Sequence, residues 1–359
     1  MHSMRARLAK VFSKAKVKQI LIINTDREDS NFLYLTGFKG GLFEGTVLLA
    51  RRSSMTLFLG PLEYGMAKRQ KPREMKLVLI ENRGMLREML NKELKERRVG
   101  INGYFVPYMT YKSFASKLKA KFVDVSDGMM EARLVKGDSE LRAMRRAVSI
   151  TKGALSAGKA ALKPGVTELQ VAAAIDTHML SMGATTAFTS IVAFDANTAL
   201  PHHAPGGARL GRNSIVLFDI GARVDNYCAD MTRTFMFRPD IGSEKYRRFT
   251  DMYSVVRKAQ EIGLSKIKEG AKGEVAHKAA AKYIDKYKGG IYKGKFIHSL
   301  GHSIGLEVHD GGAGLYPGCK TKLKENMVFS DEPGIYIDGF GGVRIEDDVV
   351  VGKSSSTFM

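Results

Sequence analysis

The feature that most constrains this chain is residues 214–237, where two apolar runs flank a short turn and each run carries one aspartate. Both runs are rich in β-branched and aromatic residues, and Asp225-Asn226 between them tolerate the positive φ of tight turns. The segment predicts a buried β-hairpin. A four-residue loop would place Asp219 opposite Asp230, whereas a two-residue loop would place Asp219 opposite Thr232 with Asp230 diagonal. In either register the two carboxylates share one face and repel each other unless a cation or proton lies between them.

A second segment, residues 332–346, repeats this arrangement with Glu332 and Glu346 at its ends and turn-forming glycines around Gly339. A three-residue loop centred on Gly339 would place the two glutamates opposite each other, and a bulge at the neighbouring proline or glycines would shift that register. Three further carboxylates remain open as inward-facing groups: Asp331, Asp347 and Asp348. Two hairpins that both carry paired carboxylates favour a metal site.

The histidines are concentrated near these hairpins in the sequence. Three of the eight, His298, His302 and His309, fall within twelve residues, and glycines beside His302 would let the backbone approach a site closely. A single histidine is more often structural than a ligand, so His298 is interpreted as structural. His202 and His203 form a second pair on a turn-like segment, and the sequence alone assigns no role to His203.

The remaining pattern predicts two domains. Short apolar runs rich in β-branched residues predict strands at 19–24, 45–50, 54–59, 76–80 and 98–101. Helices are expected at 84–97, from 138 or 139 onward, after a capping box at Thr167–Gln170, and at 243–268 and 273–287. We therefore predict an α/β domain over 1–128 and, after a junction, an α+β domain over 129–359 that mixes helices with antiparallel hairpins.

Composition excludes several classes of function. The net charge is +20, yet basic and acidic residues are interleaved and no nucleic-acid-binding motif is present, so no nucleic-acid partner is expected. Cys228 and Cys319 cannot form a disulfide framework. No apolar run approaches the ~20 residues of a membrane helix, and the basic stretch 1–18, interpreted as a surface helix, lacks the apolar block of a secretory signal. We expect a cytoplasmic protein without a membrane partner.

At these motifs the chain resembles the pita-bread metallopeptidases, specifically the branch of Xaa-Pro dipeptidases (prolidases) and Xaa-Pro aminopeptidases (aminopeptidases P). Residues 31–38, Asn-Phe-Leu-Tyr-Leu-Thr-Gly-Phe, resemble part of the creatinase-like N-terminal domain of that family, and residues from about 130 onward resemble its catalytic domain. The resemblance implies an α/β creatinase-like domain over 1–128 and an α+β pita-bread catalytic domain over 129–359.

The resemblance also implies the metal ligands. Asp219 matches a ligand of one ion, His302 and Glu332 match ligands of the other, and Asp230 and Glu346 match the bridging ligands. Four carboxylates and one imidazole suit two divalent ions such as Mn²⁺ or Co²⁺, with Zn²⁺ as an alternative. Paired ions of this kind activate a bridging water and polarise the scissile carbonyl.

Further residues match the catalytic groups of the family. His202 and His309 match the histidines that orient the substrate and stabilise the tetrahedral intermediate, and Arg344 matches the active-site arginine. Glu332 is expected to pass the proton of the attacking water towards the leaving proline nitrogen. The substrate implied is a dipeptide or short peptide with proline at its second position, and the family commonly forms homodimers.

One departure from the family pattern bears on specificity. Many prolidases carry an arginine between the second catalytic histidine and the Glu-Pro-Gly motif that binds the dipeptide carboxylate. Here residues 310–331 contain no arginine, and their only cations are Lys320, Lys322 and Lys324. The missing arginine argues against strict specificity for dipeptides and favours considering Xaa-Pro aminopeptidase activity as well. The alternatives are a methionine aminopeptidase-like enzyme, against which residues 1–128 argue, and a pita-bread binding module without catalysis, against which the complete ligand set argues.

Overall fold

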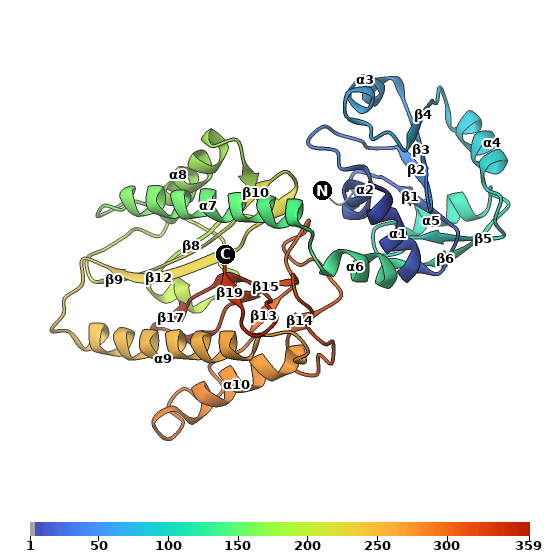
Figure 1. Cartoon of the computed structure of the whole chain (residues 1–359). Coiled ribbons are helices and arrows are strands. Elements are labelled where there is room, and N and C mark those ends of the chain that lie inside the picture. The colour runs from blue at the N-terminus through green and yellow to red at the C-terminus, as the bar shows by residue number, and fades with distance from the viewer. Residues whose placement is uncertain (1–3) are drawn as a thin grey trace. The chain divides into compact units, whose positions relative to one another are not determined.

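The computed structural model describes residues 4–359, and the chain divides into two compact units between Arg133 and Leu134 (Figure 1). The sequence placed the boundary between residues 128 and 129, a position inside helix α6 (Ser126–Leu134). The helix expected over residues 1–18 is present as α1 (Met4–Ala15), and residues 1–3 of that expectation lie outside the described part. Across residues 4–359, none of the helices combines the length and the apolar character needed to cross a membrane.

The first unit is built on one six-stranded sheet with the strand order β4-β3-β2-β1-β5-β6. Its strands are β1 (Gln19–Ile23), β2 (Val47–Arg51), β3 (Met55–Leu59), β4 (Met75–Leu79), β5 (Arg98–Ile101) and β6 (Lys121–Asp124). The strand β2 runs antiparallel to both β1 and β3, and the other neighbours are parallel. Between the strands lie α2 (Ser30–Thr36), α3 (Pro61–Gln70), α4 (Arg83–Glu93) and α5 (Tyr108–Ala115). This is the α/β arrangement that the sequence predicted.

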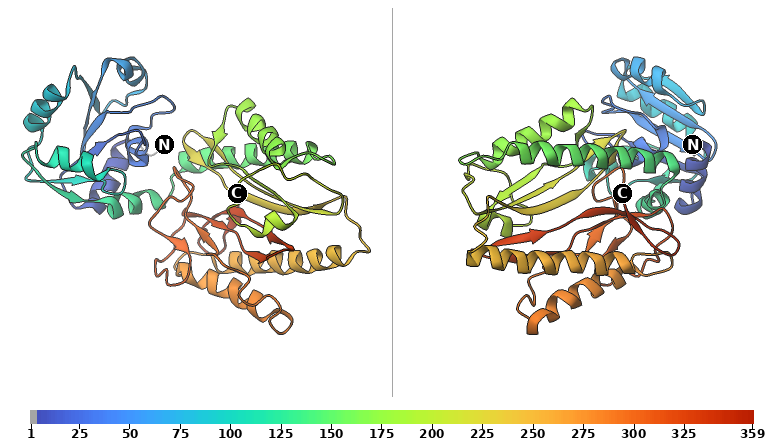
Figure 2. Two further views of the ribbon diagram at one scale, coloured as in Figure 1. Left: turned by 180° about the vertical axis from the view of Figure 1, so that it is seen from behind. Right: turned by 60° about the vertical axis from the view of Figure 1, so that its left-hand side comes forward.

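The second unit contains two pairs of long helices with strands between them (Figures 1 and 2). One pair is α7 (Asp138–Ala160) and α8 (Glu168–Ser181), and the other is α9 (Glu244–Lys266) and α10 (Gly273–Lys286). Short 3₁₀ turns follow at η1 (Asp195–Ala199) and η2 (Tyr287–Gly289). The first half of the unit supplies β7 (Thr185–Thr186), β8 (Ile191–Phe194), β9 (Ser214–Ile220), β10 (Ala222–Val224), β11 (Tyr227–Cys228) and β12 (Met231–Phe237). The second half supplies β13 (Gly301–His302), β14 (Gly314–Leu315), β15 (Val328–Asp331), β16 (Gly334–Ile337), β17 (Gly341–Arg344), β18 (Asp347–Val350) and β19 (Thr357–Phe358).

The hairpin of residues 214–237 adopts the register with the two-residue loop. Asp225 and Asn226 both have positive φ, 50° and 71°, as a primed two-residue turn requires. Thr232 therefore faces Asp219 across β9 and β12, and Asp230 is the diagonal neighbour. The alternative with a four-residue loop, in which Asp219 would face Asp230, is wrong because the left-handed pair forms a two-residue turn closed by Val224 and Tyr227.

The hairpin of residues 332–346 has the register expected from a loop centred on Gly339, which has a φ of 71°. Gly334 pairs with Arg344 in the β16–β17 ladder, and Asp331 pairs with Asp347 in the β15–β18 ladder. Residues 332–333 and 345–346 lie between the two ladders, and the pairing register is the same on both sides of this gap. Because no bulge intervenes, Glu332 and Glu346 occupy facing positions in that gap.

Two hydrophobic cores support the two halves of the second unit. One lies under α7 and α8 and includes the buried Phe218 and Ile220 of β9. The other lies under α9 and α10 and includes Phe329 of β15 and Val343 of β17. Each carboxylate-bearing hairpin is thus fixed mainly to one core by the apolar residues that alternate with its polar ones, and Ile215 of β9 reaches the other core.

The capping box predicted at the start of α8 is formed. The hydroxyl of Thr167 accepts from Gln170 N at 3.2 Å, and the Gln170 side chain accepts from Thr167 N at 3.0 Å. We expect Thr167→Ala to lower the free energy of unfolding of the second unit by about 1 kcal/mol, because one helix N–H loses its acceptor. Urea denaturation followed by circular dichroism would measure this. Thr167→Ser keeps the hydroxyl and should cost less than half as much; equal losses for both substitutions would contradict the expectation.

Candidate metal centre

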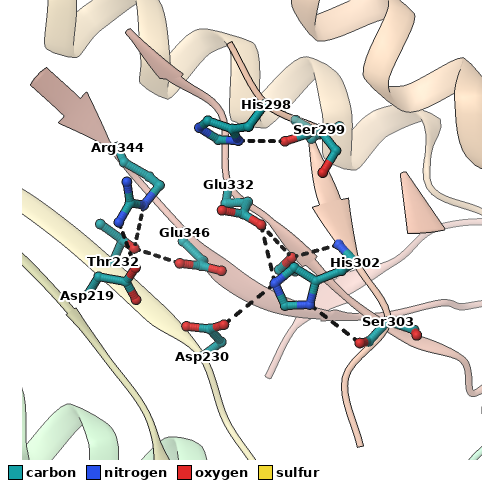
Figure 3. A network of polar contacts seen from close by, with 12 residues as sticks. Asp219, Asp230, Thr232, His298, Ser299, His302, Ser303, Glu332, Arg344 and Glu346 are labelled. Carbon is teal, nitrogen blue, oxygen red and sulfur yellow. Dashed lines mark hydrogen bonds and ion pairs between the residues drawn. The ribbon is translucent and has the colours of Figure 1, made fainter. Parts of the chain in front are cut away.

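Five side chains from distant parts of the second unit lie around one space (Figure 3). Two of them lie in strands β9 and β13, and the other three lie in the short connections that precede β12, β16 and β18. The five are the residues named from the sequence: Asp219, Asp230, Glu332, Glu346 and His302. Three of them, Asp230, His302 and Glu346, have potential ligand atoms that all lie within 4.8 Å of one another. The structure thus brings the predicted residues together.

His302 occupies the centre of the contacts on one side of this space. Its Nε2 atom lies 3.3 Å from Glu332 Oε1 and 3.7 Å from Asp230 Oδ2. Its Nδ1 atom lies 3.4 Å from the carbonyl oxygen of Ser303, which can only accept, so Nδ1 carries the proton and Nε2 offers its lone pair. Burial, together with the neighbouring His309, lowers the pKa of His302 to about 3. A neutral imidazole with a free Nε2 is the form that binds a metal ion.

The position of His302 depends on a glycine. A Cβ on Gly301 would lie 1.9 Å from the carbonyl oxygen of Ser330, so β13 can approach β15 this closely only with glycine at that position. The backbone N–H of His302 also donates to Ser330 Oγ at 3.0 Å, and that hydroxyl donates to Glu332 Oε1 at 3.2 Å. The glycine beside His302 therefore has the role that the sequence suggested.

The carboxyl groups are buried close enough to perturb one another. Burial and the charge of Glu346 raise the pKa of Asp230 well above its ordinary value, and burial and Glu332 do the same for the pKa of Glu346. Three buried oxygens, Asp219 Oδ1, Asp230 Oδ1 and Glu346 Oε1, receive no hydrogen bond from any described residue. Buried carboxylate oxygens without donors are costly unless a cation binds them. The oxygen-rich donor set with one free imidazole nitrogen therefore fits divalent metal ions.

Arg344 is the cation that the fold itself supplies. Its side chain is 3% exposed, and Nη2 lies 2.6 Å from Asp219 Oδ2. Its Nε donates to Thr232 Oγ1 at 3.1 Å and its Nη1 donates to the hydroxyl of Tyr336 at 2.8 Å. Thr232 in turn donates to Glu346 Oε2 at 2.6 Å. The guanidinium thus joins two carboxylates of the centre, one directly and one through a threonine.

The three carboxylates left open by the sequence lie outside this space. Asp347 is paired with Arg233 at 2.6 Å. Asp348 accepts from the backbone N–H of Asp230 at 3.2 Å, so it supports a residue of the centre from behind. Asp331 is fully buried against α9, where a Cβ on Gly263 would lie 2.9 Å from its Oδ1 atom. Side chains alternate along β15 and β18, so Asp331 and Asp347, the neighbours of Glu332 and Glu346 in the sequence, point to the opposite side of the sheet.

His309, His298 and His202 lie beside the centre or beside residues that support it. The ring of His309 lies 4.1 Å from that of His302, centroid to centroid. Burial and the neighbouring His202 lower the pKa of His309, and the carbonyl oxygen of Pro201, the residue before His202, lies 3.5 Å from Arg344 Nη2. His298 is bound through Nδ1 to the Ser299 carbonyl at 2.8 Å and through Nε2 to the Tyr336 hydroxyl at 2.8 Å.

Sequence reasoning did not single out Tyr336 and Ser330, and it mentioned Thr232 only as a register partner. The alternation of β12 carries a signal for Thr232, because residues two apart from Asp230 share its face. Tyr336 has a comparable signal, because the register about Gly339 places it opposite Gly342 and diagonal to Arg344, whereas its contact with His298 joins separate segments.

Comparison with known proteins settles the family. Residues 142–353 match metallopeptidase family M24, and residues 4–135 match the creatinase/prolidase N-terminal domain. The chain belongs to metallopeptidase family M24. It is a metallopeptidase that uses divalent metal, with a creatinase-type N-terminal domain and a pita-bread catalytic domain, as the sequence predicted.

Similar proteins include Xaa-Pro peptidases of two kinds. The Xaa-Pro dipeptidase of Pyrococcus horikoshii is 31% identical over 335 residues, which cover 92% of this chain and 90% of that protein. A solved structure of an Xaa-Pro dipeptidase from Bacillus anthracis has a TM-score of 0.88 at 29% identity, with 99% of this chain and 96% of that chain covered. The X-Pro aminopeptidase from Thermotoga maritima has a TM-score of 0.85 at 28% identity, with 96% and 95% covered.

The contacts of Arg344 predict a large effect on stability. Arg344→Met leaves Asp219 buried without its cation, so we expect the free energy of unfolding of the EDTA-treated protein to fall by about 3–5 kcal/mol. Arg344→Lys keeps the charge but loses the branched guanidinium that contacts three partners. Its free energy of unfolding should therefore lie between those of the wild type and Arg344→Met. Because the chain has no tryptophan, urea denaturation is followed by circular dichroism.

Arg146 provides a matched control for these variants. It is 67% exposed and lies 3.5 Å from Asp225. Arg146→Met should change the free energy of unfolding by less than about 1 kcal/mol, because exposed ion pairs contribute little. If Arg344→Met were no more harmful than Arg146→Met, the proposed dependence of Asp219 on Arg344 would be wrong.

Proposed function

We propose that this metallopeptidase hydrolyses Xaa-Pro bonds at the N-terminus of dipeptides or short peptides through a dinuclear metal centre. The observation that carries the proposal is the convergence of four carboxylates and one neutral imidazole on a buried space with undonated carboxylate oxygens. The Xaa-Pro dipeptidase and aminopeptidase names of the relatives support the substrate class.

In this proposal Asp219, Asp230, Glu346, His302 and Glu332 hold two divalent ions, with Mn²⁺ or Co²⁺ preferred and Zn²⁺ also compatible. The bound ions supply a Lewis acid for the scissile carbonyl and acidify the attacking water. Four carboxylates balance the charge of two divalent cations, which accounts for so many acidic groups in one buried space.

The other groups act on the substrate or on these ligands. His202 and His309 orient the substrate carbonyl and stabilise the oxyanion of the tetrahedral intermediate. Glu332 takes the proton of the attacking water at its carboxyl group and delivers it to the leaving proline nitrogen. Arg344 acts through Asp219 and Tyr336, because its Nη2 and Nη1 atoms are directed at these two residues.

Substrate length is a separate question. Lys320, Lys322 and Lys324 are all exposed, and Lys322 forms an isolated bridge with Lys272, which precedes α10. An exposed ammonium offers a point charge in place of the bidentate contact that an arginine makes with a carboxylate. We therefore propose that the enzyme accepts peptides longer than two residues and does not depend on a free carboxylate next to proline.

Metal binding should stabilise the fold. If Mn²⁺ binds the folded state only, about 100-fold excess over its dissociation constant adds about 2.7 kcal/mol, or roughly 5–10 °C in Tm for a unit of this size. Asp230→Asn and Glu346→Gln should lose most of that shift. Glu346→Gln should also raise the Tm of the EDTA-treated protein, because it removes one of the repelling charges. Thermal unfolding with and without Mn²⁺ measures both effects.

Asp225→Asn is the matched control for these substitutions. Asp225 lies in the turn of the same hairpin as Asp219 and is paired with Arg146. The Mn²⁺ shift of Asp225→Asn should equal that of the wild type. An undiminished Mn²⁺ shift in both Asp230→Asn and Glu346→Gln would remove these residues from the ligand set.

Hydrolysis of Gly-Pro, Arg-Pro-Pro and a Met-Gly peptide, each with Mn²⁺, with Co²⁺ and after chelation, tests the function directly. We expect metal-dependent cleavage before proline, with Arg-Pro-Pro cleaved at least as well as Gly-Pro. Cleavage of Gly-Pro alone would make the enzyme a dipeptidase, and cleavage of the Met-Gly peptide alone would favour methionine aminopeptidase activity. A folded, metal-loaded protein that cleaves none of the three would refute the proposal and favour a binding module.

A further inference from the structure

A buried glutamate at the start of α8 forms hydrogen bonds with several residues of the segment that carries His202. We call residues 194–206 the His202 segment. Glu168 is the first residue of α8 and has no exposed surface. Its carboxyl group has four contacts, all with this segment: Oε1 accepts from Phe194 N at 2.8 Å and from Asn197 Nδ2 at 2.9 Å, and Oε2 accepts from Gly206 N at 3.1 Å and lies 2.8 Å from His203 Nε2.

These contacts span the whole segment. Phe194 is its first residue and Gly206 its last, while His203 is the immediate neighbour of His202. A carboxylate that accepts several hydrogen bonds at a helix N-terminus is stabilised by the helix dipole as well as by its donors. The carboxylate is therefore a single rigid point to which both ends and the middle of the segment are attached.

His202 does not share the contact that its neighbour His203 makes with Glu168. His203 is bound to Glu168 with its side chain 14% exposed, whereas His202 is exposed and follows Pro201, whose carbonyl oxygen lies 3.5 Å from Arg344 Nη2. Gly342 N donates to Thr198 Oγ1 at 2.7 Å, which ties the segment to β17, next to the strand end that carries Arg344. The segment is thus held from behind by Glu168 and from one side by β17.

We propose that Glu168 and His203 are positioning residues for His202, and this inference rests on the catalytic role proposed for His202. His203 donates from Nε2 to the Glu168 carboxylate, and this contact fixes the backbone on the C-terminal side of His202. Neither residue touches the substrate. Their contribution to the rate passes through the placement of the His202 imidazole, and a displacement of about 1 Å can cost up to 100-fold in rate.

Two substitutions at His203 separate placement from mere packing. His203→Leu removes the donor, and we expect kcat/KM for Arg-Pro-Pro to fall about 10-fold to 100-fold. His203→Gln keeps an N–H donor of similar reach and should restore most of that loss. Because Glu168 keeps its three other hydrogen-bond donors when His203 is replaced, both variants should fold, which circular dichroism checks.

A double-mutant cycle with His202→Ala makes the decisive measurement. If His203 acts through His202, His203→Leu should cost less than about twofold in kcat/KM once His202 is alanine, because nothing remains to be positioned. Glu168→Gln should behave in the same way, since an amide can accept on only one of the two sides where Glu168 now accepts. Losses that multiply independently in the double variants would overturn the inference.

Asp176→Asn is the matched control on the same helix. Its carboxyl oxygen Oδ1 accepts from Ser190 Oγ at 2.6 Å, outside the His202 segment. The Asp176→Asn substitution removes a carboxylate from α8, as Glu168→Gln does. It should leave kcat/KM within about twofold of the wild type and show no coupling to His202.

The outcomes distinguish this inference from the function on which it rests. If His202→Ala alone leaves kcat/KM unchanged, both the catalytic role of His202 and its positioning are wrong. If His202→Ala lowers kcat/KM and the His203 losses are independent of it, only the inference fails. Crystal structures give a readout without activity: the His202 segment should be displaced in His203→Leu and retained in His203→Gln, and an undisplaced segment in His203→Leu would refute the inference.

Discussion

Mutual repulsion among four buried carboxyl groups is the constraint on which the catalytic unit depends. Asp230 and Glu346 are almost without exposed surface, and Asp219 and Glu332 are close enough to raise their pKa values. In a medium less polar than water, like charges a few ångströms apart cost several kcal/mol. Arg344 offsets part of this charge, and bound divalent metal would offset more. The polypeptide must therefore hold the groups together rigidly enough that they cannot relax by moving apart.

The two halves of the unit meet this requirement in the same way. Each hairpin places apolar residues in its own core and polar residues toward the shared space, so a carboxylate cannot turn away without exposing or stranding its apolar neighbours. Gly221 allows a further close approach, because a Cβ there would lie 2.0 Å from the carbonyl oxygen of Ala229. That contact brings the chain just before Asp230 against the end of β9, which carries Asp219. The candidate metal centre is thus built from two packed hairpins together with β13, which carries His302, and not from any single loop.

Much of this could be read from the sequence because it depends on local regularities. The alternation along β9 and β12 placed Asp219 and Asp230 on one face whichever loop was chosen, and the positive φ of Asp225 and Asn226 then selected the register. The symmetry of residues 332–346 about Gly339 gave the second register directly. The strand predicted at 98–101 coincides with β5, whereas the helix predicted at 84–97 ends at Glu93, because Gln19 accepts from the backbone N–H groups of Lys95 and Glu96 and draws the chain into the sheet.

What the sequence did not give has a different physical origin. The contacts of Glu168, and the contact of Tyr336 with His298, join residues that are brought together only after the strands and helices have packed, so no spacing along the chain indicates them. Glu168 illustrates this best, because in the sequence it stands inside a capping box and its acidic side chain is adequately explained by a helix N-terminus. Its buried position and its contacts with the His202 segment show that a local explanation can be true and still omit the contact that matters. Candidate ligands are thus recognised by their chemistry, and supporting residues such as Thr232 by strand alternation, while a supporting residue such as Glu168 is recognised only in the folded structure.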